Sequence, residues 1–148
     1  MSSVPPAGFW TEHGPFRLQE DPSSGDIFPA PYDQSWNKIA NVIYLEAPVG
    51  VGFSYSEDSK DYHNITDAES SLDNYRFLAS FFEVFGDEFG QHDFYITAES
   101  YGGHYGPTLA EQLIDNENSI NMKGLWIGNP GINSDWYVTS SFSTPVGA

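Results

Sequence analysis

The stretch Phe94-Tyr-Ile-Thr-Ala-Glu-Ser-Tyr-Gly-Gly-His-Tyr-Gly-Pro107 decides how this chain folds. Its first four residues are aromatic or β-branched, which predicts a short buried strand over residues 94–97. A turn with two consecutive glycines follows, and residues 101–115 are then predicted to form a helix. The turn itself holds a serine, Ser100. Strand, sharp turn and helix in this order provide the setting that a nucleophile elbow requires.

The residues that flank Ser100 fit such an elbow. The usual pattern is Gly-x-Ser-x-Gly, because the turn is too sharp for large neighbours. Here Ala98 replaces the first glycine, and Gly102 supplies the second. This geometry aims the serine hydroxyl at the N-terminus of the next helix, where free amides and the helix dipole favour developing negative charge. A serine beside two glycines is more often an ordinary turn, but its placement between strand and helix favours a nucleophile.

Two more strands and one more helix complete the predicted pattern. Short apolar runs predict strands over residues 39–45 and 123–128. Thr66-Asp-Ala-Glu69 has the form of a capping box, and the helix that it opens is predicted to end at Gly86. The order is βαβαβ with mostly apolar strands, which predicts an α/β fold with a parallel sheet covered on both faces. The first 38 residues contain many prolines and are predicted to be loops and short extended pieces.

Length and composition indicate a folded, strongly acidic protein. The 148 residues suffice for one domain, 1–148, with a Ser/Thr-rich end over residues 139–148 that we expect to be frayed. Hydrophobic residues make up 39% and aromatic residues 16%, which favours a packed core over disorder. Only five basic residues oppose 21 acidic ones, a net charge of −16. Nucleic acids and anionic membranes are therefore not expected as partners.

The sequence contains no signal for a cofactor or a membrane anchor. It has no cysteine, which excludes disulfides and thiolate metal sites, and no pair of histidines has ligand spacing. We therefore expect no metal and no other cofactor. No stretch approaches the roughly 20 apolar residues of a membrane span, and the first eight residues do not resemble a signal peptide. The oligomeric state is not predicted.

Four motifs, in the same order, resemble segments of the serine carboxypeptidases, a family with the α/β-hydrolase fold. Residues 99–107 resemble the active-site signature of that family, and residues 35–55 resemble its strand and Pro-Val-Gly loop. Residues 11–16 and 123–129 are similar to two further segments. The likeness extends to about residue 133. It implies a partial α/β-hydrolase domain from an enzyme that removes C-terminal residues from peptides and proteins through an acyl-enzyme.

The resemblance also implies roles for four residues. Ser100 corresponds to the nucleophile, and the amide of Tyr101 to one oxyanion donor. Glu99 and Glu12 correspond to two carboxyls that bind the free C-terminal carboxylate of the substrate. Two carboxyls in one confined site do not both ionise easily, so one stays protonated and can donate, which favours work at acidic pH. For Glu12 a solvated surface position is an equally open interpretation.

Parts of the family's catalytic machinery have no counterpart in these 148 residues. The α/β-hydrolase triad follows the order Ser, Asp or Glu, then His. The single histidine after Ser100 is His104, one turn along the same predicted helix, which suits a structural role better than that of a base. The family's Gly-Gly-Pro-Gly-Cys-Ser-Ser segment supplies a second oxyanion amide, and Met1-Ser2-Ser3 matches its last three residues alone. We expect the isolated chain to be a truncated, inactive fragment.

Three alternatives differ in their function. Some relatives transfer acyl groups to alcohols with the same nucleophile, so the sequence does not separate a peptidase from an acyltransferase. A non-catalytic remnant that binds peptide C-termini, or nothing, is the second alternative. A dinucleotide site at Gly50-Val-Gly52 is rejected, because Tyr55 stands where the third glycine belongs.

The resemblance also implies a cellular location and a modification. The family is lysosomal, vacuolar or secreted, and we expect the same of a full-length parent of this chain. Asn64-Ile-Thr66 is a glycosylation sequon in a polar stretch. We expect Asn64 to carry a glycan when the parent passes through a secretory route.

Overall fold

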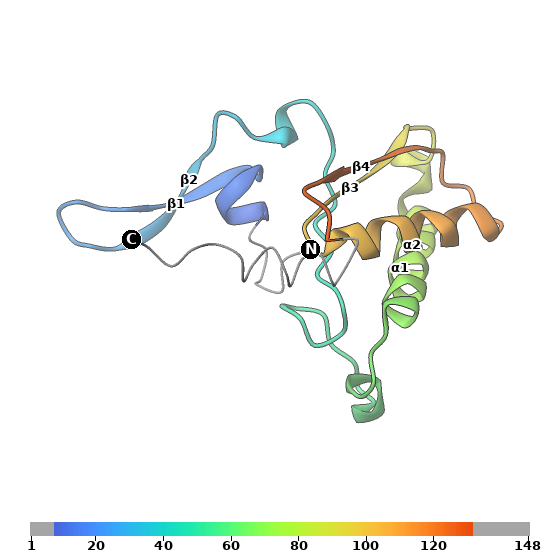
Figure 1. The fold of residues 1–148 in the computed structure, drawn as a ribbon. Helices are drawn as coiled ribbons and strands as arrows, with labels where there is room; N and C mark the ends of the chain where they lie inside the picture. Colours follow the sequence, from blue (N-terminus) through green and yellow to red (C-terminus); the bar gives the residue numbers. More distant parts are fainter. Residues whose placement is uncertain (1–7, 132–148) are drawn as a thin grey trace, which may run out of the picture. The chain divides into compact units, whose positions relative to one another are not determined.

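The structure is a computed structural model that describes residues 8–131 (Figure 1). The chain divides into two compact units, one ending at Tyr62 and the other beginning at His63. The predicted frayed end at residues 139–148 lies outside the described residues. No helix among residues 8–131 is long and apolar enough to cross a membrane.

The N-terminal unit is built around an antiparallel hairpin. Strands β1 (Phe16–Glu20) and β2 (Ile27–Pro31) pair so that Phe16 lies opposite Pro31 and Glu20 opposite Ile27. The connecting turn is held by Asp21, whose carboxylate accepts hydrogen bonds from the Ser23 hydroxyl at 2.6 Å and the Ser23 amide at 2.7 Å. These bonds lower the pKa of the Asp21 carboxyl. Three short helical turns complete the unit, namely η1 (Gly8–Glu12), η2 (Trp36–Lys38) and η3 (Ser59–Tyr62).

The prediction of a strand over residues 39–45 is wrong, because this segment has no regular secondary structure. Ile39 is 90% exposed and Ile43 is 36% exposed. The segment packs instead through Tyr44, whose ring lies 5.1 Å from that of Phe9 and 5.6 Å from that of His13. An apolar run indicates that a segment is favoured to be buried. A strand also needs a neighbouring strand to satisfy its backbone hydrogen bonds.

The second unit opens with the long helix α1 (Asp67–Phe89), and its predicted capping box is confirmed. The Thr66 hydroxyl accepts from the Glu69 amide at 3.2 Å, and the Glu69 carboxylate accepts from the Thr66 amide at 2.9 Å. The predicted end at Gly86 is wrong. The backbone leaves helical geometry at Phe85 (φ −111°, ψ 17°) and the helix then resumes to Phe89. Phe89 stacks on Phe81 with ring centroids 5.9 Å apart, so packing favours one more turn.

The remaining elements form a β-α-β unit. Strand β3 (Phe94–Glu99) leads into helix α2 (Gly102–Asp115), and strand β4 (Met122–Gly128) follows. Strands β3 and β4 are parallel, with Ile96 opposite Leu125 and Glu99 opposite Gly128. The predicted parallel strands and the helix between them are confirmed. The chain has a partial α/β fold in which a small parallel sheet carries the candidate elbow at the end of β3.

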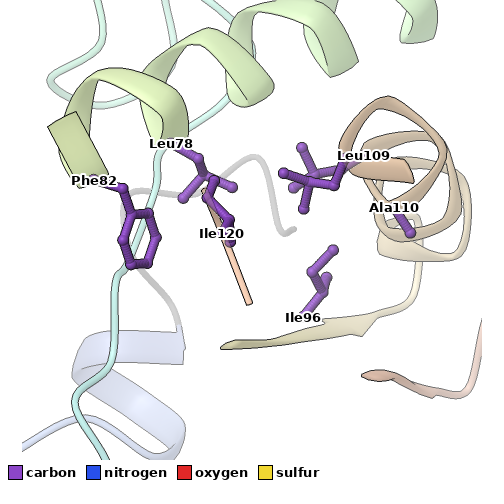
Figure 2. Close-up of a cluster of buried hydrophobic side chains, with 7 residues drawn as sticks. Leu78, Phe82, Ile96, Leu109, Ala110 and Ile120 are labelled. Atoms are coloured by element: carbon purple, nitrogen blue, oxygen red, sulfur yellow. The ribbon is translucent and has the colours of Figure 1, made fainter. Parts of the chain in front are cut away.

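In the described part of the chain, a cluster of buried side chains joins these elements (Figure 2). Leu78 and Phe82 project from α1 towards Ile96 of β3 and Leu109 of α2. Burying a side chain of this size contributes about 1.5–3 kcal/mol. The cluster therefore holds α1 and α2 together beside the strand that ends at the candidate elbow. Its full membership is Leu78, Phe82, Ile96, Leu109, Ala110, Leu113 and Ile120.

Candidate active site

Ser100 sits in the turn between β3 and α2 with an uncommon backbone conformation. Its φ is +56°, in the left-handed region that residues other than glycine seldom adopt. The Ser100 amide donates to the Gly128 carbonyl at 3.2 Å. The Ser100 carbonyl accepts from the amides of Gly103 at 2.9 Å and Gly131 at 2.8 Å. These bonds hold a strained residue in place, while its side chain lies at the exposed start of α2.

Small residues around the turn allow its backbone segments to approach closely. A Cβ atom on Gly106 would lie 3.2 Å from the Ala98 Cβ and 3.1 Å from a methyl carbon of Leu125. A Cβ atom on Gly103 would lie only 2.8 Å from the Pro130 Cβ. Glycine at these two positions lets α2 pack directly against the sheet. The alanine at the first position of the elbow motif fits because Gly106 faces it.

Tyr101 follows Ser100 at the N-cap position of α2, with φ −62° and ψ −16°. Among residues 8–131 its amide makes no hydrogen bond, as the first amides of a helix commonly do not. Free amides at a helix N-terminus stabilise negative charge. The arrangement can therefore accept an oxyanion that forms next to the Ser100 hydroxyl.

The Tyr101 side chain points to the start of α1. Its hydroxyl donates to the two carboxylate oxygens of Asp67, each at 3.2 Å. The ring centroids of His104 and Tyr105 lie 4.7 Å and 5.1 Å from that of Tyr101. Burial raises the pKa of the Tyr101 phenol, and the charge and hydrogen bond of Asp67 raise it further. Burial likewise raises the pKa of Tyr105, with smaller contributions from Asp67 and Tyr101.

His104 also lies beside Asp67, with its Nδ1 atom 3.9 Å from a carboxylate oxygen. No hydrogen bond joins His104 to Ser100 within the described part of the chain. The structural role expected for His104 stays a prediction.

The two predicted carboxyls belong to different units. Glu99 is the last residue of β3, exposed and directly before Ser100. Glu12 ends η1 in the N-terminal unit, where its Oε2 atom lies 4.0 Å from the His13 Nε2 atom and its side chain is 49% exposed. The structure brings Glu99, Ser100 and Tyr101 into one turn. The pairing of Glu12 with Glu99 stays a prediction.

Asn64 lies three residues before the first residue of α1 and is exposed, with a φ of +56°. Thr66, the third residue of the sequon, is the helix cap described above. The glycan itself stays a prediction.

Sequence reasoning missed the role of two carboxylates. Asp67 was predicted only as part of a capping box, and nothing in the sequence links it to a tyrosine 34 positions away. Glu46, in the loop after residue 45, accepts a hydrogen bond from the Phe53 amide, while its other carboxylate oxygen is buried without a hydrogen-bond partner among the described residues. No group of three or more His, Asp or Glu residues within 8–131 is arranged to hold a metal ion.

A strained serine between a parallel strand and a helix is the arrangement that defines the α/β-hydrolases. The sequence model of the serine carboxypeptidases matches residues 2–146, and the chain belongs to this family of serine peptidases.

Individual relatives agree with this assignment. Putative serine carboxypeptidase-like 30 of Arabidopsis thaliana is 46% identical over 138 residues, covering 87% of this chain and 27% of that protein. Serine carboxypeptidase-like 34 of the same plant is 46% identical over 125 residues, covering 80% of this chain and 24% of that protein. The crystal structure of a prohormone-processing carboxypeptidase from Saccharomyces cerevisiae superposes with a TM-score of 0.67 at 25% identity. The superposed part covers 92% of this chain and 30% of the yeast chain. The chain thus spans about a quarter of the length of the curated relatives it matches.

Proposed function

We propose that this sequence supplies the nucleophile region of a serine-type carboxypeptidase, with Ser100 as the acyl-forming residue. The observation that carries the proposal is the left-handed backbone of Ser100 at a strand-to-helix turn. A non-glycine residue keeps such a conformation only where its surroundings enforce it, and these sites are frequently functional. Family membership supports the same reaction.

The proposed reaction has two steps. The Ser100 oxygen bonds to the carbonyl carbon of the last peptide bond of the substrate, and its proton passes to a general base. The C–N bond then breaks, and the departing C-terminal residue takes up that proton on its amine. Water next cleaves the acyl-serine ester, which releases the shortened peptide and restores the hydroxyl. The residue that acts as base is not identified among residues 8–131.

Tyr101 and the two glutamates take supporting roles in this proposal. The Tyr101 amide, which makes no hydrogen bond within residues 8–131, stabilises the oxyanion that forms on the carbonyl oxygen. Glu99 and Glu12 bind the C-terminal carboxylate of the substrate, as the family resemblance implies.

The test compares two proteins on a blocked dipeptide. The isolated 148 residues should release no appreciable C-terminal amino acid, whereas a full-length gene product that contains this sequence should release it. Ser100→Ala should abolish that release, and Ser134→Ala, outside the motifs, is the matched control. Release by the full-length protein that survives Ser100→Ala would overturn the proposal. Transfer of the acyl group to an added alcohol, with no hydrolysis, would instead identify an acyltransferase.

The proposal extends to the location of the parent protein, which we place in the vacuole, the lysosome or the extracellular space. The exposed sequon at Asn64 is compatible with passage through a secretory route.

A further inference from the structure

The Asp67 carboxylate contacts two side chains at the start of α2, those of Tyr101 and His104. Both of its oxygens lie 3.2 Å from the Tyr101 hydroxyl, and one lies 3.9 Å from the His104 Nδ1 atom. Asp67 is the first residue of α1, whereas Tyr101 is the N-cap of α2 and His104 lies in the first turn of α2. The contact therefore links the first turns of two helices that pack against one another.

The position of this link matters because Ser100 is strained. Backbone hydrogen bonds to Gly128, Gly131 and Gly103 hold Ser100 itself. None of these bonds restrains the Tyr101 amide, and Tyr101 makes no side-chain cap for its own helix. Its 48%-exposed side chain is instead held by Asp67. A charge-assisted hydrogen bond of this type is stronger than a neutral one.

We propose that Asp67 is a positioning residue, whose carboxylate fixes the Tyr101 side chain and, through it, the turn that presents the Ser100 hydroxyl and the Tyr101 amide. His104 is the second partner of the same carboxylate. The catalytic consequence rests on the proposed function, but the effect on the turn does not. The ionisable side chains around the Tyr101 phenol are those of Asp67, His104 and Tyr105, and the pKa of the phenol is raised by burial first and then by the Asp67 carboxylate.

A simpler role for Asp67 makes a different prediction. An acid in the first turn of a helix stabilises that helix through its dipole. If this were its whole role, removing the carboxylate would loosen α1 and leave the turn unchanged.

The experiment measures amide hydrogen exchange by NMR in the 148-residue chain. The informative amides are those of Gly103 and His104, which donate to the carbonyls of Ser100 and Tyr101. Asp67→Ala and Tyr101→Phe should each accelerate their exchange roughly fivefold, since a half-exposed charged hydrogen bond contributes modestly. The double variant should exchange no faster than either single one. Asp67→Asn, which keeps an acceptor, should lie between Asp67→Ala and the unaltered chain.

Asp73→Ala is the matched control, because Asp73 is an exposed acid of the same helix that pairs with Arg76 at 3.3 Å. It should leave Gly103 and His104 unchanged. The proposal is overturned if Asp67→Ala changes exchange only within α1, or if the effects of Asp67→Ala and Tyr101→Phe add. Tyr101→Phe loses only a hydroxyl, so it gives a result even if Asp67→Ala does not fold.

Labelling of Ser100 by a fluorophosphonate, a serine-reactive probe, separates this inference from the proposed function. If the full-length gene product is labelled, Asp67→Ala and Tyr101→Phe should slow its labelling by a similar factor. If Ser100 in that protein is never labelled, the proposed nucleophile is wrong, and the exchange rates still decide whether Asp67 holds the turn.

Discussion

The backbone of Ser100 is strained, because its φ of +56° is unfavourable for any residue with a Cβ atom. Ser100→Gly should therefore stabilise the chain by about 0.5–1 kcal/mol relative to Ser100→Ala, because glycine adopts this conformation without a steric penalty. Urea denaturation of the two variants measures the difference. Equal stability of the two would show that the turn is not strained.

Gly52 is a position where an added side chain would be strained and would displace the Glu46 carboxylate. Its φ is +57°, and a Cβ atom there would lie 2.0 Å from the Glu46 carboxyl carbon. Gly52→Ala should destabilise the N-terminal unit by about 1–3 kcal/mol, through strain and displacement of Glu46. Gly25→Ala is the control, since Gly25 has a similar φ of +77° but its nearest contact would be 3.9 Å away. A loss of stability in Gly25→Ala as large as in Gly52→Ala would exclude the role of Glu46.

The Tyr101 phenol predicts how the chain responds to alkali. Burial first, and then the Asp67 charge, raise its pKa above the ordinary 10.0. Between the ordinary pKa, which applies to the unfolded chain, and the raised pKa in the folded chain, Tyr101 keeps its proton only when the chain is folded. The free energy of unfolding therefore falls as pH rises through this window, and this group does not affect it at lower pH. Asp67→Asn should lower the pKa of Tyr101. The shift is measured from tyrosinate absorbance, with Tyr101→Phe identifying the signal, and an unchanged pKa would contradict the contact.

At the scale of elements, the start of α1 combines a cap with a sequon. Thr66→Ala should cost about 1 kcal/mol, because it removes the hydroxyl that accepts from the Glu69 amide, while the Thr66 backbone amide still donates to Glu69. Thr66→Ser keeps the hydroxyl and should retain most of that stability. Thermal or urea denaturation of the two variants tests the difference, and equal losses in both would contradict the cap.

The same residues predict a glycan on Asn64 in a full-length precursor expressed through a secretory route. Intact-mass analysis before and after glycosidase treatment should reveal it on the Asn64 peptide. Asn64→Gln and Thr66→Ala should both abolish the mass shift, whereas Thr66→Ser should keep it. Absence of any shift on that peptide would show that the sequon is not used.

The sequence predicted some helices and strands correctly and others wrongly. The helix from Thr66, the helix before residue 115 and the strands around Ile96 and Leu125 were predicted, because cap residues and apolar spacing are local signals. The strand over 39–45 and the helix end at Gly86 were not, because each depends on a partner. Within residues 8–131 no strand pairs with residues 39–45, and Phe89 extends α1 by stacking on Phe81.

At the scale of the whole molecule, a net charge of −16 on 148 residues implies strong self-repulsion in the folded chain. Raising the salt concentration should increase the melting temperature by a few degrees, since the Debye length shrinks from about 10 Å at 0.1 M to about 3 Å at 1 M. Sucrose serves as a control that does not screen charge. A melting temperature that does not change with salt would show that the acidic groups are too far apart to repel.

The sequence by itself determined the strand-to-helix turn that holds Ser100, and it determined the family. Strand, turn, Ser100 and helix are consecutive, so short-range sterics and hydrogen bonds suffice to specify them. The Asp67 contact with Tyr101, in contrast, was decided only by the tertiary structure. It joins residues 34 positions apart, and they meet because α1 and α2 pack over one apolar cluster. Apolar spacing predicts that two helices bury a face, but it does not predict which polar groups come together at their ends.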